Sequence, residues 1–198
     1  MKLTTNTALV TCFLLTTISC TKENVISHSS EMANSTGNTV SFTIGQRYGG
    51  GIIFYIDTTG LHGLIADTVD LRQASWNNPK NKLSIEIGTS KRIGTGYKNT
   101  DKIVLSLGDS GKYAARECWR SKRSGYTDWF LPSKEELDEL YLQRNVVGGF
   151  ANTYLAEYCS SSEFSGTLAL FRNFYTGKLS YHDKGSWNHY YVRAVRAF

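Results

Sequence analysis

The sequence predicts an α+β domain in which two helices pack on a mostly antiparallel sheet of short strands. Aromatic residues make up 13% of the chain, which suits strands and binding surfaces better than a helical bundle. Short apolar runs bounded by Gly-containing turns occur in both halves of the chain, and two segments between them have helical spacing. Because 198 residues with 40% hydrophobic content can bury one ordinary core, we expect a single domain.

The first residues form a targeting segment. Lys2 precedes an apolar stretch, residues 8–18, which is too short to span a bilayer comfortably. The stretch ends at Thr17–Cys20, which resembles a lipobox, where the cysteine becomes the diacylated first residue after cleavage. We therefore expect residues 1–19 to be a lipoprotein signal peptide and Cys20 to be the lipidation site. An ordinary secretory signal is the alternative.

Residues 20–38 are rich in Ser, Asn and Thr and poor in large apolar residues, so we expect a flexible tether. Within it, Thr21-Lys22-Glu23 is similar to the short charged signal that directs Bacteroidetes-type lipoproteins to the outer face of the outer membrane, although Asn24 stands where a second acid is often found. We expect a protein that is lipid-anchored in the outer membrane and exposed on the cell surface, with the periplasmic face as the alternative. Acyl chains anchor through about 0.8 kcal/mol per buried methylene.

The domain itself is expected at residues 39–198 and begins with strands. Val40–Ile44 alternates with strand period, and Ile52–Ile56 and Gly63–Ala66, joined by a Gly-containing loop, predict a hairpin. Gly49–Gly51 leads into a strand, so it indicates backbone curvature instead of a phosphate loop. Residues 70–106 have little periodicity and predict a long loop, which by position is a candidate recognition surface.

Two helices follow. In Gly111–Ser121, small apolar residues cluster on one side, and four basic residues fall on the other as one stripe: Lys112, Arg116, Arg120 and Arg123. The second helix starts after Pro132, with Ser133 and Glu136 forming a capping box. Its expected buried residues are Leu137, Leu140 and Tyr141, and its acidic residues, Glu135, Glu136, Asp138 and Glu139, are expected on a solvated face.

Short strands complete the chain. We expect them at residues 158–162, 168–175, 178–182 and 190–198, with a turn at Thr176-Gly177. The last one has one buried and one charged face, and it ties the end of the chain into the sheet.

Three blocks carry a resemblance to a known family: residues 128–137 (DWFLPSKEEL), 160–163 (SSSE) and 191–198 (YVRAVRAF). In this order they resemble the C-terminal domain family of Lcl, the collagen-like bacterial adhesin. The resemblance implies a C-type-lectin-like fold with long loops, in which the closing strand packs beside the first one. The family's adhesin binds sulfated glycans. With only two prolines, this chain shares the globular end and not the collagen-like repeat.

The cysteine pattern leaves one pair in the mature domain. Cys12 lies in the signal and Cys20 would be the acylated residue, so Cys118 and Cys159 could form a disulfide worth about 3–4 kcal/mol or remain two buried thiols. The resemblance favours thiols, because relatives usually have Trp where Cys159 stands.

No pattern supports catalysis, a metal or a cofactor. The four histidines have no metal-ligand or nucleophile–base spacing, and Trp187-Asn188-His189 only half resembles the calcium-binding strand of lectins. We therefore expect a domain that binds a ligand and is not an enzyme.

Two groups of residues are candidates for binding. Lys112, Arg116 and Arg120 suit an anionic polysaccharide, which the resemblance also implies, and the loop with Trp187, Asn188, His189 and Tyr190 suits a protein ligand. The alternatives are a solvated helix face and an ordinary polar loop. The loop also resembles the variable region of retroelement-diversified lectin-fold receptors. A structural or assembly subunit of the cell envelope is the rival from another class. We expect no nucleic-acid partner, and the sequence leaves homo-oligomerisation open.

Overall fold

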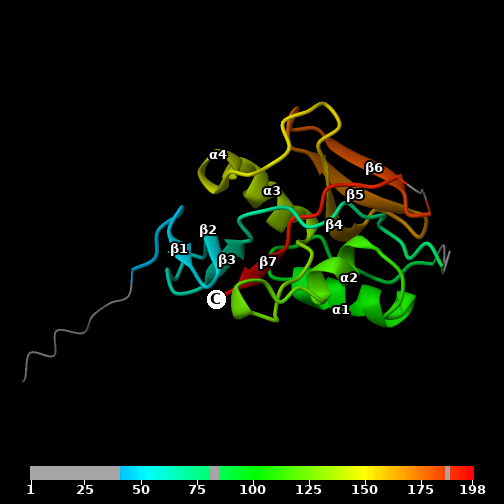
Figure 1. Ribbon diagram of the computed structural model, residues 1–198, viewed down its shortest axis with the longest axis horizontal. Coiled ribbons are helices and arrows are strands. Elements are labelled where there is room, and N and C mark those ends of the chain that lie inside the picture. Colours follow the sequence, from blue (N-terminus) through cyan, green and yellow to red (C-terminus); the bar gives the residue numbers. More distant parts are fainter. Residues whose placement is uncertain (1–40, 81–84, 186–187) are drawn as a thin grey trace, which may run out of the picture. The chain divides into compact units, whose positions relative to one another are not determined.

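The computed structural model describes residues 41–80, 85–185 and 188–198, which fall in one unit with the bounds Thr39–Phe198. In this part of the chain the strands form two antiparallel sheets (Figure 1). One sheet has the order β1-β2-β3-β7, with β1 at Arg47–Tyr48, β2 at Gly51–Ile56, β3 at Gly63–Ala66 and β7 at Val195–Ala197. The other has the order β4-β5-β6, with β4 at Glu157–Glu163, β5 at Leu168–Asn173 and β6 at Leu179–Asp183. The chain is thus α+β, as predicted.

Helices pack against both sheets. The described α-helices are α1 (Gly96–Leu107), α2 (Ala114–Trp119), α3 (Lys134–Leu142) and α4 (Arg144–Val147), and Arg123–Gly125 forms a 3-10 turn. Helix α1 contacts α2 and β4, whereas α3 contacts β2 of the first sheet and β4 and β5 of the second. Because α3 touches both sheets, it joins them into one body (Figure 1).

The capping box of α3 is present. Ser133 Oγ accepts the Glu136 N–H at 3.3 Å, and Ser133 N–H donates to Glu136 Oε2 at 2.7 Å. Glu136 is fully buried and also accepts the N–H groups of Gly94 and Gly96, so the expectation of a solvated acidic face is wrong for this residue. Burial raises the pKa of Glu136 even though these N–H donors oppose the shift.

The sequence predicted a long loop at residues 70–106, but α1 occupies the end of that segment, so this prediction is wrong. The prediction of only two helices is wrong for the same reason. The buried side of α1 combines Ile103, Val104 and Leu107 with polar residues, which hides its apolar period. Asn99 donates to Ser90 O at 2.7 Å, and Thr100 Oγ1 accepts the Leu131 N–H at 2.9 Å. Polar side chains that find buried partners can line a core face, but periodicity does not detect them.

The ends of the domain also differ from expectation. Residues 41–44 are not a strand, and Val40 lies outside the described residues. Phe42 instead packs its ring on Phe198, with centroids 4.6 Å apart. The closing strand begins at Val195 and pairs with β3, so it does not lie beside a strand at residues 40–44. The hairpin of β2 and β3 is confirmed, and Gly51 is required there, since a Cβ would come within 2.1 Å of Ala66 O.

The closing segment, residues 190–198, connects the two sheets (Figure 1). Tyr191 bridges to Tyr158 of β4, and β7 then pairs with β3. Arg193 has a fully buried side chain and donates to Asp70 Oδ1 at 2.7 Å. Arg196 makes two bonds to Asp128, at 2.9 and 2.7 Å, which hold the pKa of that carboxyl below its usual value.

We expect deletion of Tyr191–Phe198 to abolish the cooperative thermal transition, because it removes β7 and both arginine anchors together. Circular dichroism melting of residues 39–198 and of the truncated form measures this. A cooperative melt that survives the deletion would show that the closing segment is dispensable. As a milder control, Phe198→Ala should only lower the melting temperature.

Candidate functional site

Two pockets meet at His189. The first, which we name the cationic pocket, has a volume of about 510 Å³ and is lined by His189 together with Ser75, Pro79, Lys80, Gly111, Lys112 and Arg116. The second, which we name the aromatic pocket, has a volume of about 420 Å³ and is lined by His189 together with Tyr154, Leu155, Glu157, His182, Asn188 and Tyr190. From the two groups of candidate residues named from the sequence, Lys112 and Arg116 line the first pocket, and Asn188, His189 and Tyr190 line the second.

The lining of the cationic pocket includes two lysines and one arginine. Lys80 and Lys112 are exposed, and neither makes an ion pair with a residue that the structure describes. Arg116 is largely buried, donates from Nε to Asp109 Oδ1 at 2.9 Å and from Nη1 to Gly111 O at 2.8 Å, and so is partly neutralised. Because the described lining includes no acidic side chain, the pocket favours an anion.

The expected basic stripe along one helix is not formed. Helix α2 starts at Ala114, so Lys112 lies before it, and Arg120 is its C-terminal cap. Arg120 approaches Asp109 at 3.7 Å and does not line the pocket. Arg123 lies in the 3-10 turn and pairs with Asp67 at 2.6 Å.

The aromatic pocket has rings held by their neighbours. Tyr154 lies against Tyr175 with centroids 4.6 Å apart, and its carbonyl accepts the Asn173 side-chain amide at 2.8 Å. Tyr190 packs on Phe171 and stacks on His182, with centroids 4.2 and 5.3 Å apart. These contacts position the pocket before any ligand arrives.

A carboxylate lies in the wall of the aromatic pocket. Glu157 Oε2 accepts Ser180 Oγ at 2.8 Å and contacts His182 Nε2 at 2.6 Å. Its other oxygen, Oε1, has no hydrogen-bond partner among the described residues. Ser180 is bonded to the carboxylate and not to His182, so the three side chains do not form a nucleophile with its base.

The candidate residues of the loop differ in burial. Asn188 and His189 are exposed, whereas Tyr190 is buried and lines the aromatic pocket. Trp187 and the lipidation candidate Cys20 lie outside the described residues. The sequence analysis missed Lys80, Tyr154, Glu157 and His182. No local pattern marks them, because they come from four separate segments.

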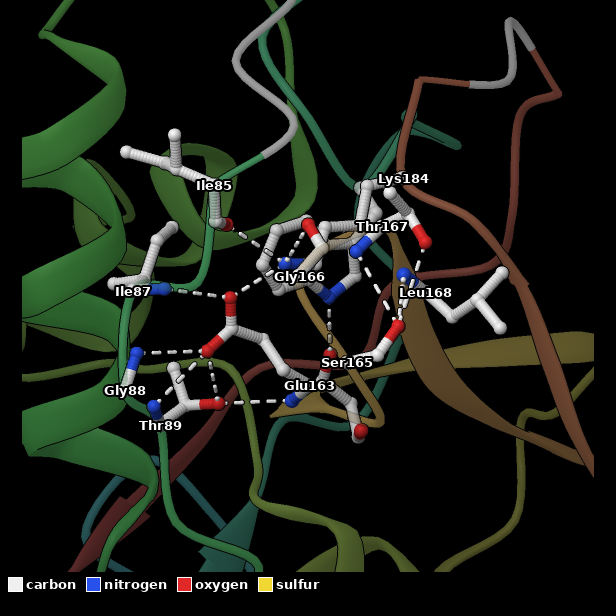
Figure 2. Close-up of polar contacts among 12 residues, drawn as sticks. Ile85, Ile87, Gly88, Thr89, Glu163, Ser165, Gly166, Thr167, Leu168 and Lys184 are labelled. Atoms are coloured by element: carbon white, nitrogen blue, oxygen red, sulfur yellow. Dashed lines mark hydrogen bonds and ion pairs between the residues drawn. The ribbon is translucent and has the colours of Figure 1, made fainter.

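A buried ion pair anchors the base of the loop that bears Asn188 and His189 (Figure 2). Lys184 Nζ lies 2.5 Å from Glu163 Oε1, and the two side chains are 2% and 4% exposed. Figure 2 shows the Glu163 carboxylate also accepting the N–H groups of Ile87, Gly88 and Thr89, at 2.8, 2.9 and 3.0 Å. Burial alone would raise the pKa of Glu163, but these N–H donors and the Lys184 ammonium lower it overall.

The remaining cysteines, Cys118 and Cys159, are both buried free thiols. Burial raises the pKa of each thiol well above its usual value, so both are neutral. They act as small core residues.

Among the described residues, no group of three His, Cys, Asp or Glu side chains is placed to hold a metal ion. No described helix is long and apolar enough to cross a membrane.

Comparison with known proteins finds a similar solved structure and no matching family. No family model and no curated protein matches the chain. Among solved structures, the chain is similar to a fimbrial protein from Bacteroides ovatus, with a TM-score of 0.48 and 14% sequence identity. The match covers 73% of this chain and 43% of the fimbrial protein, so the chain spans less than half the length of that structure.

We expect Glu163→Gln to destabilise the domain by about 3–5 kcal/mol at pH 7, since it leaves the buried Lys184 ammonium without a counter-charge. The folded-state pKa of Glu163 is lowered, so the stability it provides is complete above its unfolded pKa of about 4.3 and is lost as the pH falls through the folded pKa. The difference between wild type and variant should therefore narrow in acid. Urea unfolding from pH 7 to pH 3 measures it.

Asp101→Asn, which changes an exposed carboxylate on α1, is the control and should show no such pH-dependent difference. A cost of Glu163→Gln that stays constant down to pH 3 would contradict the role of the charged pair.

Proposed function

We propose that this chain is a lipid-anchored, surface-exposed outer-membrane protein whose domain binds an anionic glycan without catalysing a reaction. The cationic pocket carries the proposal, because its lining includes Lys80 and Lys112, and neither lysine makes an ion pair with a described residue. Ammonium groups on a concave surface attract sulfate and carboxylate groups and concentrate an anionic ligand. Lipid attachment at Cys20 would leave the domain outside the membrane at the end of its tether.

The resemblance to the Lcl C-terminal domain family supports the same proposal, including a C-type-lectin-like fold. Two of its blocks contain residues that hold the domain together: Ser133 and Glu136 cap α3, and Glu163 binds Lys184 and the backbone N–H groups of residues 87–89. The third block supplies Arg193 and Arg196. These contacts support a shared scaffold. The ligand of this chain must then be argued from its own pockets.

We expect the double variant Lys80→Ala/Lys112→Ala to lose most of its binding to heparin, about tenfold or more, because each lysine contributes an ion pair in a shared pocket. The measurement is the retention of residues 39–198 on immobilised heparin at 50 and 300 mM salt. Wild-type retention should fall steeply with salt.

The control is Lys98→Ala/Lys122→Ala, which removes the same charge from exposed positions outside the pocket and should leave retention nearly unchanged. Equal losses of retention in both double variants would show that heparin binding depends on net charge and not on the cationic pocket. Absence of retention in wild type would refute anionic glycan binding.

Assembly with a neighbouring envelope protein is the second candidate, and one observation favours it. At the two ends of the β5–β6 ladder, Lys178 O accepts the Asn173 N–H and Lys184 N–H donates to Thr167 O. The alternating positions Leu179, Tyr181 and Asp183 therefore direct their backbone groups outward. Among the described residues nothing pairs with this edge, and Tyr181 is 57% exposed. Open edges with aromatic side chains accept a further strand.

If β6 pairs with a partner strand, Tyr181→Lys should reduce the amount of the full chain in a high-mass envelope complex several-fold, because a lysine on the edge opposes strand addition. Native electrophoresis of solubilised outer membranes measures this, with Tyr97→Lys on α1 as the control. An unchanged complex in the Tyr181 variant would exclude assembly through this edge.

A further inference from the structure

We propose that the aromatic pocket binds the ring of an uncharged saccharide unit, stacked on Tyr154 and hydrogen-bonded by Glu157 and Asn188. The inference deepens the proposed function and rests on it in one respect, since the ring would belong to the same glycan whose anionic group enters the cationic pocket. The pocket volume, about 420 Å³, is adequate for one or two sugar rings.

The stacking surface is apolar and open. Tyr154 is 74% exposed and Leu155 is 82% exposed, although both border a concave site. Large exposed apolar side chains at a pocket mouth indicate a surface that a ligand covers. A pyranose ring presents a face of C–H groups that packs on an aromatic ring, and tyrosine provides such area at a low cost in side-chain entropy. Tyr175 and Asn173 already hold the Tyr154 segment in place.

The polar groups of the pocket suit hydroxyl donors. An ionised carboxylate only accepts hydrogen bonds, and Glu157 keeps Oε1 available while Ser180 and His182 occupy Oε2. The exposed Asn188 amide both donates and accepts. Neighbouring hydroxyl groups on a sugar ring supply donors and acceptors in one plane, so these two side chains match them.

Charge separates the roles of the two pockets. The Glu157 carboxylate repels an anion from the aromatic pocket, whereas Lys80 and Lys112 attract one to the cationic pocket. His189 lines both pockets, so adjacent units of one chain can occupy them together. The surface therefore suits a glycan in which an uncharged unit lies next to a charged one.

The test uses uncharged probes at high salt, where the cationic pocket contributes little. Saturation-transfer NMR would measure the binding of residues 39–198 to β-linked tetrasaccharides of glucose, galactose and N-acetylglucosamine in 0.5 M salt, where the Debye length is about 4 Å. We expect binding of at least one probe, with a loss of about tenfold or more in Tyr154→Ala and in Glu157→Gln.

Two controls test whether a loss of saccharide binding is specific to the aromatic pocket. Tyr97→Ala removes an exposed tyrosine elsewhere and should leave the affinity unchanged, and thermal melting shows whether each variant is folded. Lys80→Ala/Lys112→Ala should retain the uncharged probes while losing heparin.

The two proposals fail separately. Absence of binding to all three uncharged probes, or binding that survives both aromatic-pocket variants, overturns the saccharide-ring inference even if heparin retention still depends on Lys80 and Lys112. Loss of heparin retention by wild type, with uncharged probes still bound, overturns the anionic part and leaves the ring site standing.

Discussion

The buried guanidinium of Arg193 is the interaction on which the rest of the domain depends. Its side chain is fully buried, and removing such a charge from water costs several kcal/mol unless it is paired and its donors are used. Here it bonds to Asp70, Asp67 O and the carbonyls of the Gly148-Gly149 turn, and it lies over the Phe150 ring at 3.9 Å. The Arg193 guanidinium thus links three segments: the closing segment, the chain after β3 and the turn after α4. Its hydrogen bonds are complete only when all three segments are in place.

The sequence predicted those elements whose signals are local. The β2–β3 hairpin follows from apolar runs around a turn, and α3 follows from a capping box within four residues. Long-range polar pairs have no such signature: Arg193 and Asp70 are 123 residues apart, and Lys184 and Glu163 are 21 apart. Helix α1 was missed for a related reason, because the buried side chains of Asn99 and Thr100 are polar and also bond to distant residues, Ser161 and Leu131. Periodicity detects apolar burial, so it fails where burial is polar.

The sequence predicted some of the residues that line the two pockets but not how these residues are arranged in space. The sequence marked Lys112, Arg116 and Asn188–Tyr190, and the structure places them around His189. It did not predict Glu157 or His182, which lie on β4 and β6 and meet across the intervening strand β5. Helical spacing also placed Arg120 in the basic surface, because the helix was expected at Gly111–Ser121, whereas α2 spans only Ala114–Trp119. The error in the helix boundaries therefore led to an incorrect grouping of the basic side chains on one surface.

The residues that specify the fold are largely separate from those that line the pockets. Asp128 pairs with Arg196, Glu136 closes the start of α3, and Glu163 binds three backbone N–H groups, so all three blocks that carry the family resemblance act within the scaffold. The pocket walls come from segments outside those blocks, around residues 80, 112, 154 and 189. Substitution at Lys80 or Tyr154 would leave the anchors untouched, whereas substitution at Arg193 would not. A scaffold built in this way can keep its fold while its ligand changes, so the ligand has to be argued from the residues that line the pockets.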